Sequence, residues 1–263
     1  MRDLPTPTTA GCRLAEELIA EGVDIIVTIG TPTVVAAKSA TTTIPIVMSG
    51  SADPVEHGLV ASLRNPGGNI TGVTHSPGPE FAAKGLELLK EAAPSISRVA
   101  VLVDSSTVHE PLSLERQRAV APKLGLTLLP HDVKGVRSGD DIAAIFSEIM
   151  KEGADALFVY PNFVNGKYAS AITSFASASR LPAMYQDTDY TDIGGLISYY
   201  TNWLSLRRRA AFYVDKIIKG TKPADLPVEE PTTFELVVNL KTAKALGLSI
   251  PPSILTRADK VME

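Results

Sequence analysis

Two sets of polar residues follow short apolar runs, at places where a folded chain could bind a small molecule. The first set combines hydroxyl groups, glycines and one carboxylate: Gly30, Thr31, Ser49, Gly50, Ser51 and Asp53. Hydroxyl groups and the backbone N–H groups at the start of a helix can hold an anion such as a carboxylate. The alternative is that Thr31 and Asp53 only cap helices, and for Asp53 capping is the favoured interpretation.

The second set lies further along the chain and mixes polar with aromatic side chains. Its members are Asp104, Ser105, Tyr160, Asn162, Tyr185 and Gln186. Such a mixture is typical of a pocket for a small organic molecule. Each tyrosine is equally compatible with a place in the core or at a rim, because its ring is apolar and only its hydroxyl needs a partner.

Sequence signatures of catalysis are missing from the chain. It has no glycine-rich nucleotide motif and no G-x-S-x-G nucleophile turn. The four histidines are scattered without metal-ligand spacing: His57, His75, His109 and His131. Polar strand ends without catalytic spacing favour binding over turnover, so we expect no catalytic residue, no metal site and no cofactor.

The composition excludes several classes of partner. The chain has 263 residues, is 44% hydrophobic and 21% charged, and carries a net charge of −4. This is typical of a globular chain with one large or two small domains. The acidic balance makes nucleic acid an unfavoured partner, and the run Arg207-Arg208-Arg209 is best interpreted as a solvated helix face. The single cysteine, Cys12, excludes an internal disulfide.

No apolar run approaches the roughly 20 residues that a bilayer span requires. Residues 1–10 hold three threonines and two prolines instead of the apolar segment of a signal peptide. As written, the chain would therefore stay in the cytoplasm.

The first set of polar residues follows two strand–turn–helix units. A nearly continuous apolar run at 24–29 predicts a buried parallel strand, and Thr31 with Pro32 predicts a capped helix over 32–39. Residues 44–48 predict the next strand. There Asp53 is expected to cap a helix opened by Pro54, with Glu56 completing a capping box. Two helix N-termini would then converge on the candidate anion site.

A short strand at 70–74 divides the chain between two breakers, the turn at 65–69 and the prolines and glycine of 76–79. It is either a crossing between two lobes or an ordinary edge strand, and the pattern favours neither. Strands alternating with helices continue to the end of the chain, which predicts an α/β fold of two doubly wound lobes. We expect crossings near Thr74, Tyr200 and Ala224. Residues 1–74 with 200–224 would form the first lobe, and 75–199 with 225–263 the second.

Three long motifs carry a resemblance to a known family. They are TIPIVMSGSADPVEHGLVASLRNPGGNITGV at 43–73, LPAMYQ followed by GLISYY, and the tail that begins GTKPADLPVEEPTTFELVVNL at Gly220. From about Leu14 onward the chain resembles substrate-binding proteins of ABC transporters of the tryptophan-binding type, which have the type I periplasmic binding protein fold.

The resemblance implies two lobes joined by a hinge, with a small organic solute in the interlobe cleft. It implies a periplasmic, non-enzymatic, monomeric protein that delivers its ligand to a membrane permease. Carried over by position, the ligand residues are the two polar sets named above. The ligand would be an amino acid or another carboxylate. We expect its anion near Thr31 and 49–51 and its ring against Tyr160 or Tyr185.

The chain differs from the family at its start. Members begin with a secretion signal and a strand–helix–strand unit, where this chain has residues 1–9. The resemblance therefore implies an incomplete first lobe. The alternatives are a cytoplasmic ligand-sensing domain of a regulator, a non-functional truncated remnant, and an enzyme on a doubly wound fold. The missing catalytic motifs weigh against the enzyme.

Overall fold

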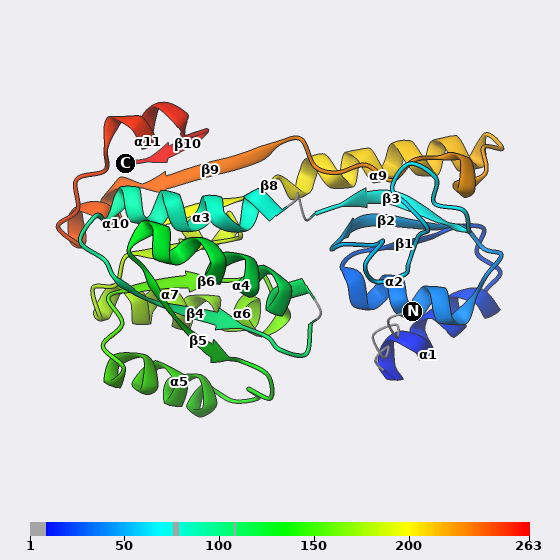
Figure 1. Cartoon of the computed structure of the whole chain (residues 1–263). Helices are drawn as coiled ribbons and strands as arrows, with labels where there is room; N and C mark the ends of the chain where they lie inside the picture. Colours follow the sequence, from blue (N-terminus) through cyan, green and yellow to red (C-terminus); the bar gives the residue numbers. More distant parts are fainter. Residues whose placement is uncertain (1–8, 76–78, 108) are drawn as a thin grey trace. The chain divides into compact units, whose positions relative to one another are not determined.

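The computed structural model describes residues 9–75, 79–107 and 109–263, which form two compact α/β units (Figure 1). The first unit contains 9–75 and 201–233, and the second contains the described residues of 79–200 with 234–263. Within these ranges each unit has its own sheet, one of three strands and one of seven. The predicted α/β class is confirmed. The breaker residues 76–78 lie outside the described residues.

The first unit is a three-stranded parallel sheet with helices on both faces. The strands pair in the order β1-β2-β3, with Ile26 opposite Ile46 and Ile46 opposite Ile70. Its elements are α1 (Thr9–Ala20), β1 (Ile26–Thr28), α2 (Thr31–Ala40), β2 (Ile46–Ser51), β3 (Ile70–Thr74), α9 (Trp203–Ile218) and the short 3-10 helix η2 (Pro223–Asp225).

The core of this unit follows the alternation of side chains along β2. Ile46 and Met48 face α2, which buries Val34 and Val35 against them. Val47 faces the other way and packs with Leu206 and its neighbours on α9. Because successive strand residues point to opposite faces, a nearly continuous apolar run serves both helix layers.

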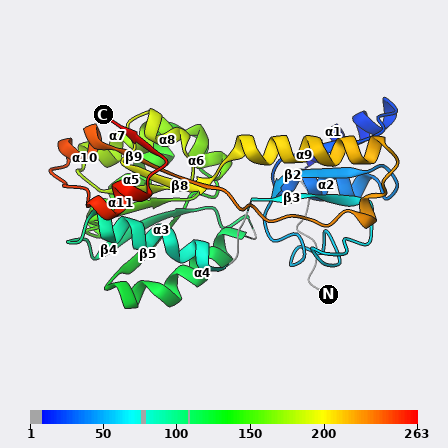
Figure 2. The ribbon, with the colours of Figure 1, turned by 90° about the horizontal axis from the view of Figure 1, so that it is seen from above.

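The strand β1 departs from the expected complete burial. Ile26 is 4% exposed, but Val27 and Ile29 are 52% and 53% exposed. The helix α9 crosses β2 and β3 (Figure 2) and leaves β1 at the edge of the sheet. The side chains of Val27 and Ile29 are therefore about half exposed to solvent, beside the edge of β1 that pairs with no other strand in the described part of the chain.

The segment that returns from α9 belongs to the first unit as far as Thr233, nine residues beyond the expected crossing at Ala224. Its backbone pairs with β3, because Thr74 N–H donates to the Glu229 carbonyl and Glu229 N–H donates to the Gly72 carbonyl. The Glu229 side chain also forms an ion pair with Arg209 of α9, at 2.5 Å. These bonds explain why residues 225–233 stay with the first unit.

The second unit is built on a seven-stranded sheet in the order β10-β9-β8-β7-β6-β4-β5. The pairs β5–β4, β4–β6, β6–β7, β7–β8 and β9–β10 are parallel. Its strands are β4 (Arg98–Val103), β5 (Thr127–Asp132), β6 (Ala156–Val159), β7 (Ala183–Tyr185), β8 (Ile197–Thr201), β9 (Phe234–Asn239) and β10 (Lys260–Met262). The helices are α3 (Pro79–Ala92), α4 (His109–Val120), η1 (Ala121–Leu124), α5 (Gly139–Lys151), α6 (Phe163–Lys167), α7 (Ala169–Ala178), α8 (Asp189–Asp192), α10 (Leu240–Ala245) and α11 (Pro252–Arg257).

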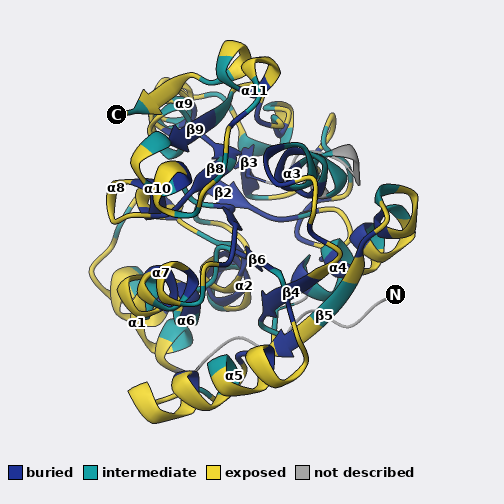
Figure 3. Cartoon of the chain, turned by 90° about the vertical axis from the view of Figure 1, so that its left-hand side faces the viewer, coloured by how far each residue is buried: buried dark blue, intermediate teal, exposed yellow. Residues whose placement is uncertain are grey.

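Alternate residues of β4 divide between two helix layers. Val99, Val101 and Val103 pack with α3, α4, α10 and α11 on one face. Ala100 and Leu102 pack with α5, α7 and α8 on the other. Figure 3 shows the buried strands β4 and β6 and the exposed outer surface of α5. With both faces covered, the polar ends of these strands are the places left for a ligand.

We expect the exposed face of β1 to make the chain self-associate as its concentration rises, because Val27 and Ile29 offer apolar surface beside an open strand edge. Replacing both by threonine should reduce that association and change the free energy of unfolding by less than about 1 kcal/mol per site. Sedimentation velocity over a range of concentrations measures the effect.

The matched control is Ile218→Thr, since this side chain is 73% exposed but lies at the end of α9. Equal association of the Val27→Thr/Ile29→Thr protein and the wild type would contradict the role given to β1.

Candidate functional site

The first-unit residues gather where β1 and β2 end. Gly30 N–H donates to the Gly50 carbonyl at 2.8 Å, which joins the two strand ends. The pairing of β2 with β3 shifts register between Ser49 and Ser51. Gly50 has a φ of 106° there, and a Cβ atom would come within 2.9 Å of the Trp203 ring. Glycine is therefore required at this turn.

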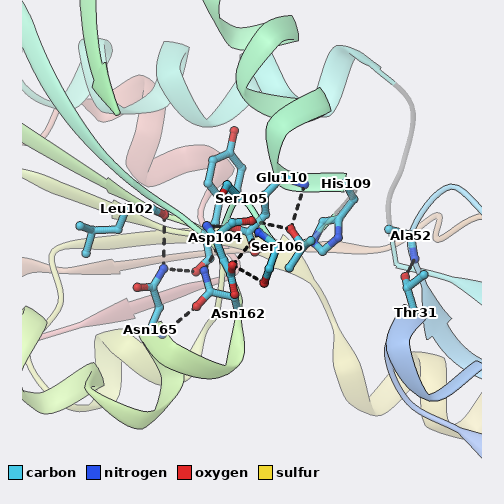
Figure 4. Close-up of polar contacts among 12 residues, drawn as sticks. Thr31, Ala52, Leu102, Asp104, Ser105, Ser106, His109, Glu110, Asn162 and Asn165 are labelled. Atoms are coloured by element: carbon cyan, nitrogen blue, oxygen red, sulfur yellow. Dashed lines mark hydrogen bonds and ion pairs between the residues drawn. The ribbon is translucent and has the colours of Figure 1, made fainter. Parts of the chain in front are cut away.

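Thr31 is not the N-cap that the sequence predicts. The cap is Gly30, which has no side chain to offer, and Thr31 is the first residue of α2. Its hydroxyl lies 3.2 Å from the Ser51 hydroxyl and accepts from Ala52 N–H at 3.0 Å. The buried hydroxyl thus ties the start of α2 to the end of β2 (Figure 4).

Asp53 does not begin a helix, so the prediction of a capped helix at Pro54 is wrong. The backbone of Asp53 has a φ of 37°, in the left-handed region, whereas an N-cap residue is extended. Residues 54–58 form successive turns, and Gly58 N–H bonds to the Val55 carbonyl. Of the two helices that the sequence predicts to begin at these strand ends, the described residues form only α2. Since Pro32 has no N–H group, hydroxyl groups are the main donors there.

In the second unit, the predicted residues Asp104 and Ser105 lie in the turn after β4. The Asp104 carboxylate accepts from Ser106 N–H at 2.9 Å, which closes the turn. The Ser105 hydroxyl donates to Asp132, at the end of the neighbouring strand β5, at 2.5 Å. The loops that follow β4 and β5 are thus held together by side-chain hydrogen bonds.

Asn162 follows β6 and caps the short helix α6, because its side-chain oxygen accepts from Asn165 N–H at 2.8 Å. Its amide nitrogen donates to Glu110 at 3.1 Å. Sequence reasoning did not single out Glu110, which lies in the first turn of α4. The missed signal is an acidic residue in the first turn of a helix that follows a strand end.

The two predicted tyrosines and Gln186 are buried. Tyr160 is 2% exposed and its hydroxyl donates to Gln117 at 2.9 Å. Tyr185 is 1% exposed and stacks on Tyr190, with ring centroids 4.6 Å apart. Gln186 N–H pairs with the Val159 carbonyl, which places it directly after β7. Both rings are therefore part of the packing behind the strand ends.

Two aromatic residues that the sequence did not single out lie at the strand ends of the first unit. The ring centroids of His75 and Trp203 are 5.5 Å apart, and both side chains lie near Gly50. His75 is buried, which lowers its pKa to about 4, so it is neutral at pH 7. Trp203 is only partly buried and offers apolar surface beside the hydroxyl groups.

The described ranges hold no group of three or more His, Cys, Asp or Glu residues that could bind a metal ion. No helix in the same ranges is long and apolar enough to cross a membrane.

Glu110 makes stability depend on pH in a defined direction. Burial raises the pKa of its carboxyl from 4.5 to about 7, with Asp104 and Asp132 adding to the shift. The folded state binds the proton of Glu110 more tightly than the unfolded state does. Protonated Glu110 therefore adds its full contribution to the free energy of unfolding below pH 4.5, and this contribution is lost as the pH rises through 7. We expect this group alone to lower the free energy of unfolding by roughly 3 kcal/mol between these limits.

Chemical denaturation of the wild type and of Glu110→Gln at several pH values isolates this contribution. Buried His75 makes the free energy of unfolding change with pH in the opposite direction, but it does so in both proteins, so its effect cancels when the two are subtracted. A difference between the two proteins that does not change from pH 4.5 to 8 would contradict it.

Comparisons with known proteins identify the family. The family model described as ABC transporter substrate binding protein matches residues 8–262. A solved ABC domain in complex with L-Trp, from Streptococcus pneumonia, is 32% identical with a TM-score of 0.86 and covers 96% of this chain and 83% of that chain. A conserved domain protein from Vibrio cholerae is 27% identical with the same TM-score, 0.86, and the same coverage of 96% and 83%.

A curated tyrosine-binding protein of Clostridioides difficile (strain R20291) is 26% identical over 246 residues, which are 94% of this chain and 68% of that protein. The fold prediction of a type I periplasmic binding protein is confirmed by these structural matches. Since family members bind a substrate without transforming it, the prediction of a non-enzymatic component holds as well. The chain belongs to the substrate-binding proteins of ABC transporters.

Proposed function

We propose that this protein captures an aromatic amino acid, such as tryptophan or tyrosine, outside the cytoplasmic membrane and delivers it to an ABC permease. The family supports the transport role. The ligand class is supported by two relatives, the solved domain that holds L-Trp and the tyrosine-binding protein. In this proposal the hydroxyl groups at the strand ends of the first unit receive the carboxylate of the ligand.

The observation that carries the proposal is the cluster of hydroxyl groups at the start of α2. Thr31 and Ser51 share one hydrogen bond, and Ser49 is 2% exposed with no hydrogen-bond partner for its hydroxyl in the described part of the chain. A buried hydroxyl without a partner is costly unless something else accepts its proton. A carboxylate supplies that acceptor, and the positive end of α2 favours its charge.

The aromatic part of the ligand is supported by Trp203, which stands beside Gly50 at the same strand ends. The expectation that the ring lies against Tyr160 or Tyr185 stays a prediction. Substituting either tyrosine is a poor test, because removing a buried aromatic ring costs about 3–5 kcal/mol of stability by itself. The polar residues Asp104, Ser105, Asn162 and Gln186 remain proposed ligand contacts of the second unit.

A thermal-shift screen of the purified chain with the common amino acids tests the ligand class. A ligand at 100 times its dissociation constant adds about 2.7 kcal/mol to the stability of the folded state, which shifts a melting curve clearly. We expect L-tryptophan or L-tyrosine to give the largest shift. If sugars stabilise the protein and no amino acid does, the proposal fails.

Thr31→Val tests the carboxylate site, because valine keeps the shape of threonine and removes the hydroxyl. A hydrogen bond to a charged group contributes about 1.5–3 kcal/mol, so we expect L-tryptophan to bind roughly 10 to 100 times more weakly. Binding of tryptamine, which lacks the carboxylate, should not change. Isothermal titration calorimetry measures both ligands.

The control is Ser39→Ala, near the other end of α2, where the hydroxyl only donates to the Val35 carbonyl. If Thr31→Val weakens tryptamine as much as tryptophan, the hydroxyl serves the fold and not the ligand.

A further inference from the structure

The helix α9 concentrates positive charge on a chain that is acidic as a whole. Residues 203–222, which comprise α9 and the turn after it, contain six lysines and arginines and one acidic residue, Asp215. The whole chain has 25 lysines and arginines against 29 acidic residues. The positive charge of α9 therefore stands out against a strongly negative remainder.

The cations lie on the side of α9 that faces away from the sheet. Leu206, Ala210 and Tyr213 are buried on the side that packs on β2 and β3. Figure 2 shows α9 lying over these strands, with no other described helix or strand of the first unit above it. Four exposed cations define what we call the basic face of α9: Arg207, Arg208, Lys216 and Lys219.

Most of this charge is not compensated within the protein. Arg207, Arg208 and Lys216 form no ion pair in the described part of the chain, whereas Lys219 pairs with Asp215 at 2.8 Å. Cations on a solvated helix are commonly compensated by a carboxylate four residues away. Here the residues four positions before and after each of the three unpaired cations are uncharged. The stability of the fold therefore gives no reason for this arrangement of charges.

An aromatic side chain lies among the cations. Phe212 is 39% exposed, and its ring centroid is 3.9 Å from Cζ of Arg209 and 5.4 Å from Nζ of Lys216. These cation–π contacts hold the ring between two positive groups. Lysine and arginine around a partly exposed aromatic ring are typical of segments that lie on lipid headgroups.

The spacing of the cations matches an extended negative surface. Arg207 and Lys219 are twelve residues apart, which is about 18 Å along the axis of a helix. A free phosphate is held by cations that converge on one point, whereas these are spread along a convex helix. A lipid surface offers negative charge over the whole length, and the family works beside a membrane because its members serve ABC transporters.

We propose that the basic face of α9 docks the protein on a membrane surface that carries anionic phospholipid headgroups. The inference goes beyond the proposed function, since it does not depend on which solute is bound. Charges more than about 8 Å from the surface are largely screened at physiological ionic strength, so the negative remainder of the chain does not cancel the contact. Each cation near such a surface strengthens binding about fivefold.

Co-sedimentation with lipid vesicles tests the proposal. The wild-type chain is mixed with vesicles of phosphatidylcholine alone and with vesicles in which about a third of the lipid is phosphatidylglycerol. We expect binding to the anionic vesicles only, and a decrease in that binding as the salt concentration rises towards about 1 M. The triple variant Arg207→Gln/Arg208→Gln/Lys216→Gln should bind the anionic vesicles about 100-fold more weakly.

The matched control removes the same charge elsewhere. Lys123, Lys151 and Lys241 are exposed and lie in the second unit. Their triple substitution by glutamine should leave vesicle binding within about twofold of the wild type, because these lysines are not on the basic face. Thermal melts of both triple variants show that each is folded, since exposed substitutions of this kind change stability little.

A second variant should strengthen the contact. Asp215 is the one acidic residue of α9, and its exposed carboxylate pairs with Lys219. Replacing it by asparagine removes the negative charge and frees the lysine, so we expect Asp215→Asn to bind anionic vesicles about fivefold more tightly. A variant that is merely damaged would not gain affinity.

Three results would each overturn membrane docking by α9. The first is wild-type protein that binds neutral and anionic vesicles equally or binds neither. The second is an equal loss of binding in the two triple variants. The third is a change in the sedimentation coefficient of the protein alone when the basic face is substituted, which would assign this face to a second copy of the chain. Loss of amino-acid binding in the thermal-shift screen leaves this inference standing, so the two proposals fail separately.

Discussion

The parallel pairing of strands is the constraint on which the rest of this structure depends. In a parallel sheet all carboxyl ends lie at one edge, so the residues that follow each strand are gathered whatever their distance in the sequence. In the second unit β4, β5 and β6 run parallel. Asp104, Asp132 and Asn162 therefore meet although they are far apart along the chain. Helices cover both faces of the sheet, which leaves this edge as the polar surface that a ligand can reach.

Short side-chain hydrogen bonds then fix these loops before any ligand arrives. Ser105 binds Asp132 across two strand ends, and Asn162 binds both its own helix and Glu110. In the first unit, Thr31 joins α2 to β2 in the same way. Groups already held in place lose little conformational freedom on binding, which favours affinity and selectivity. A family of binding proteins can change its ligand by changing such loop residues while the sheet remains the same.

The fold could be predicted from the sequence because its signals are local. Apolar runs such as 98–103 mark buried strands, and Gly125 marks the end of a helical segment. The candidate site could be predicted only in part. Asp53 with Pro54 has the pattern of a helix start, but a left-handed backbone at Asp53 overrides it. The carboxylate of Glu110 carries a local signal, an acidic residue in the first turn of a helix, but its complete burial cannot be read from local residue types.

The backbone pairing of Glu229 with β3 has a consequence for assembly. A sheet with two open edges can add copies at both ends and grow into a fibre. Here the returning segment covers β3, with a bridge between Val73 and Glu229, and only β1 lies at an uncovered edge in the described part of the first unit. Strand pairing between two copies through β1 uses up the free edge of each, so it closes on itself as a two-fold dimer and terminates. The segment 226–233, which returns along β3 after η2, thus sets an upper limit to the size of any assembly formed in this way.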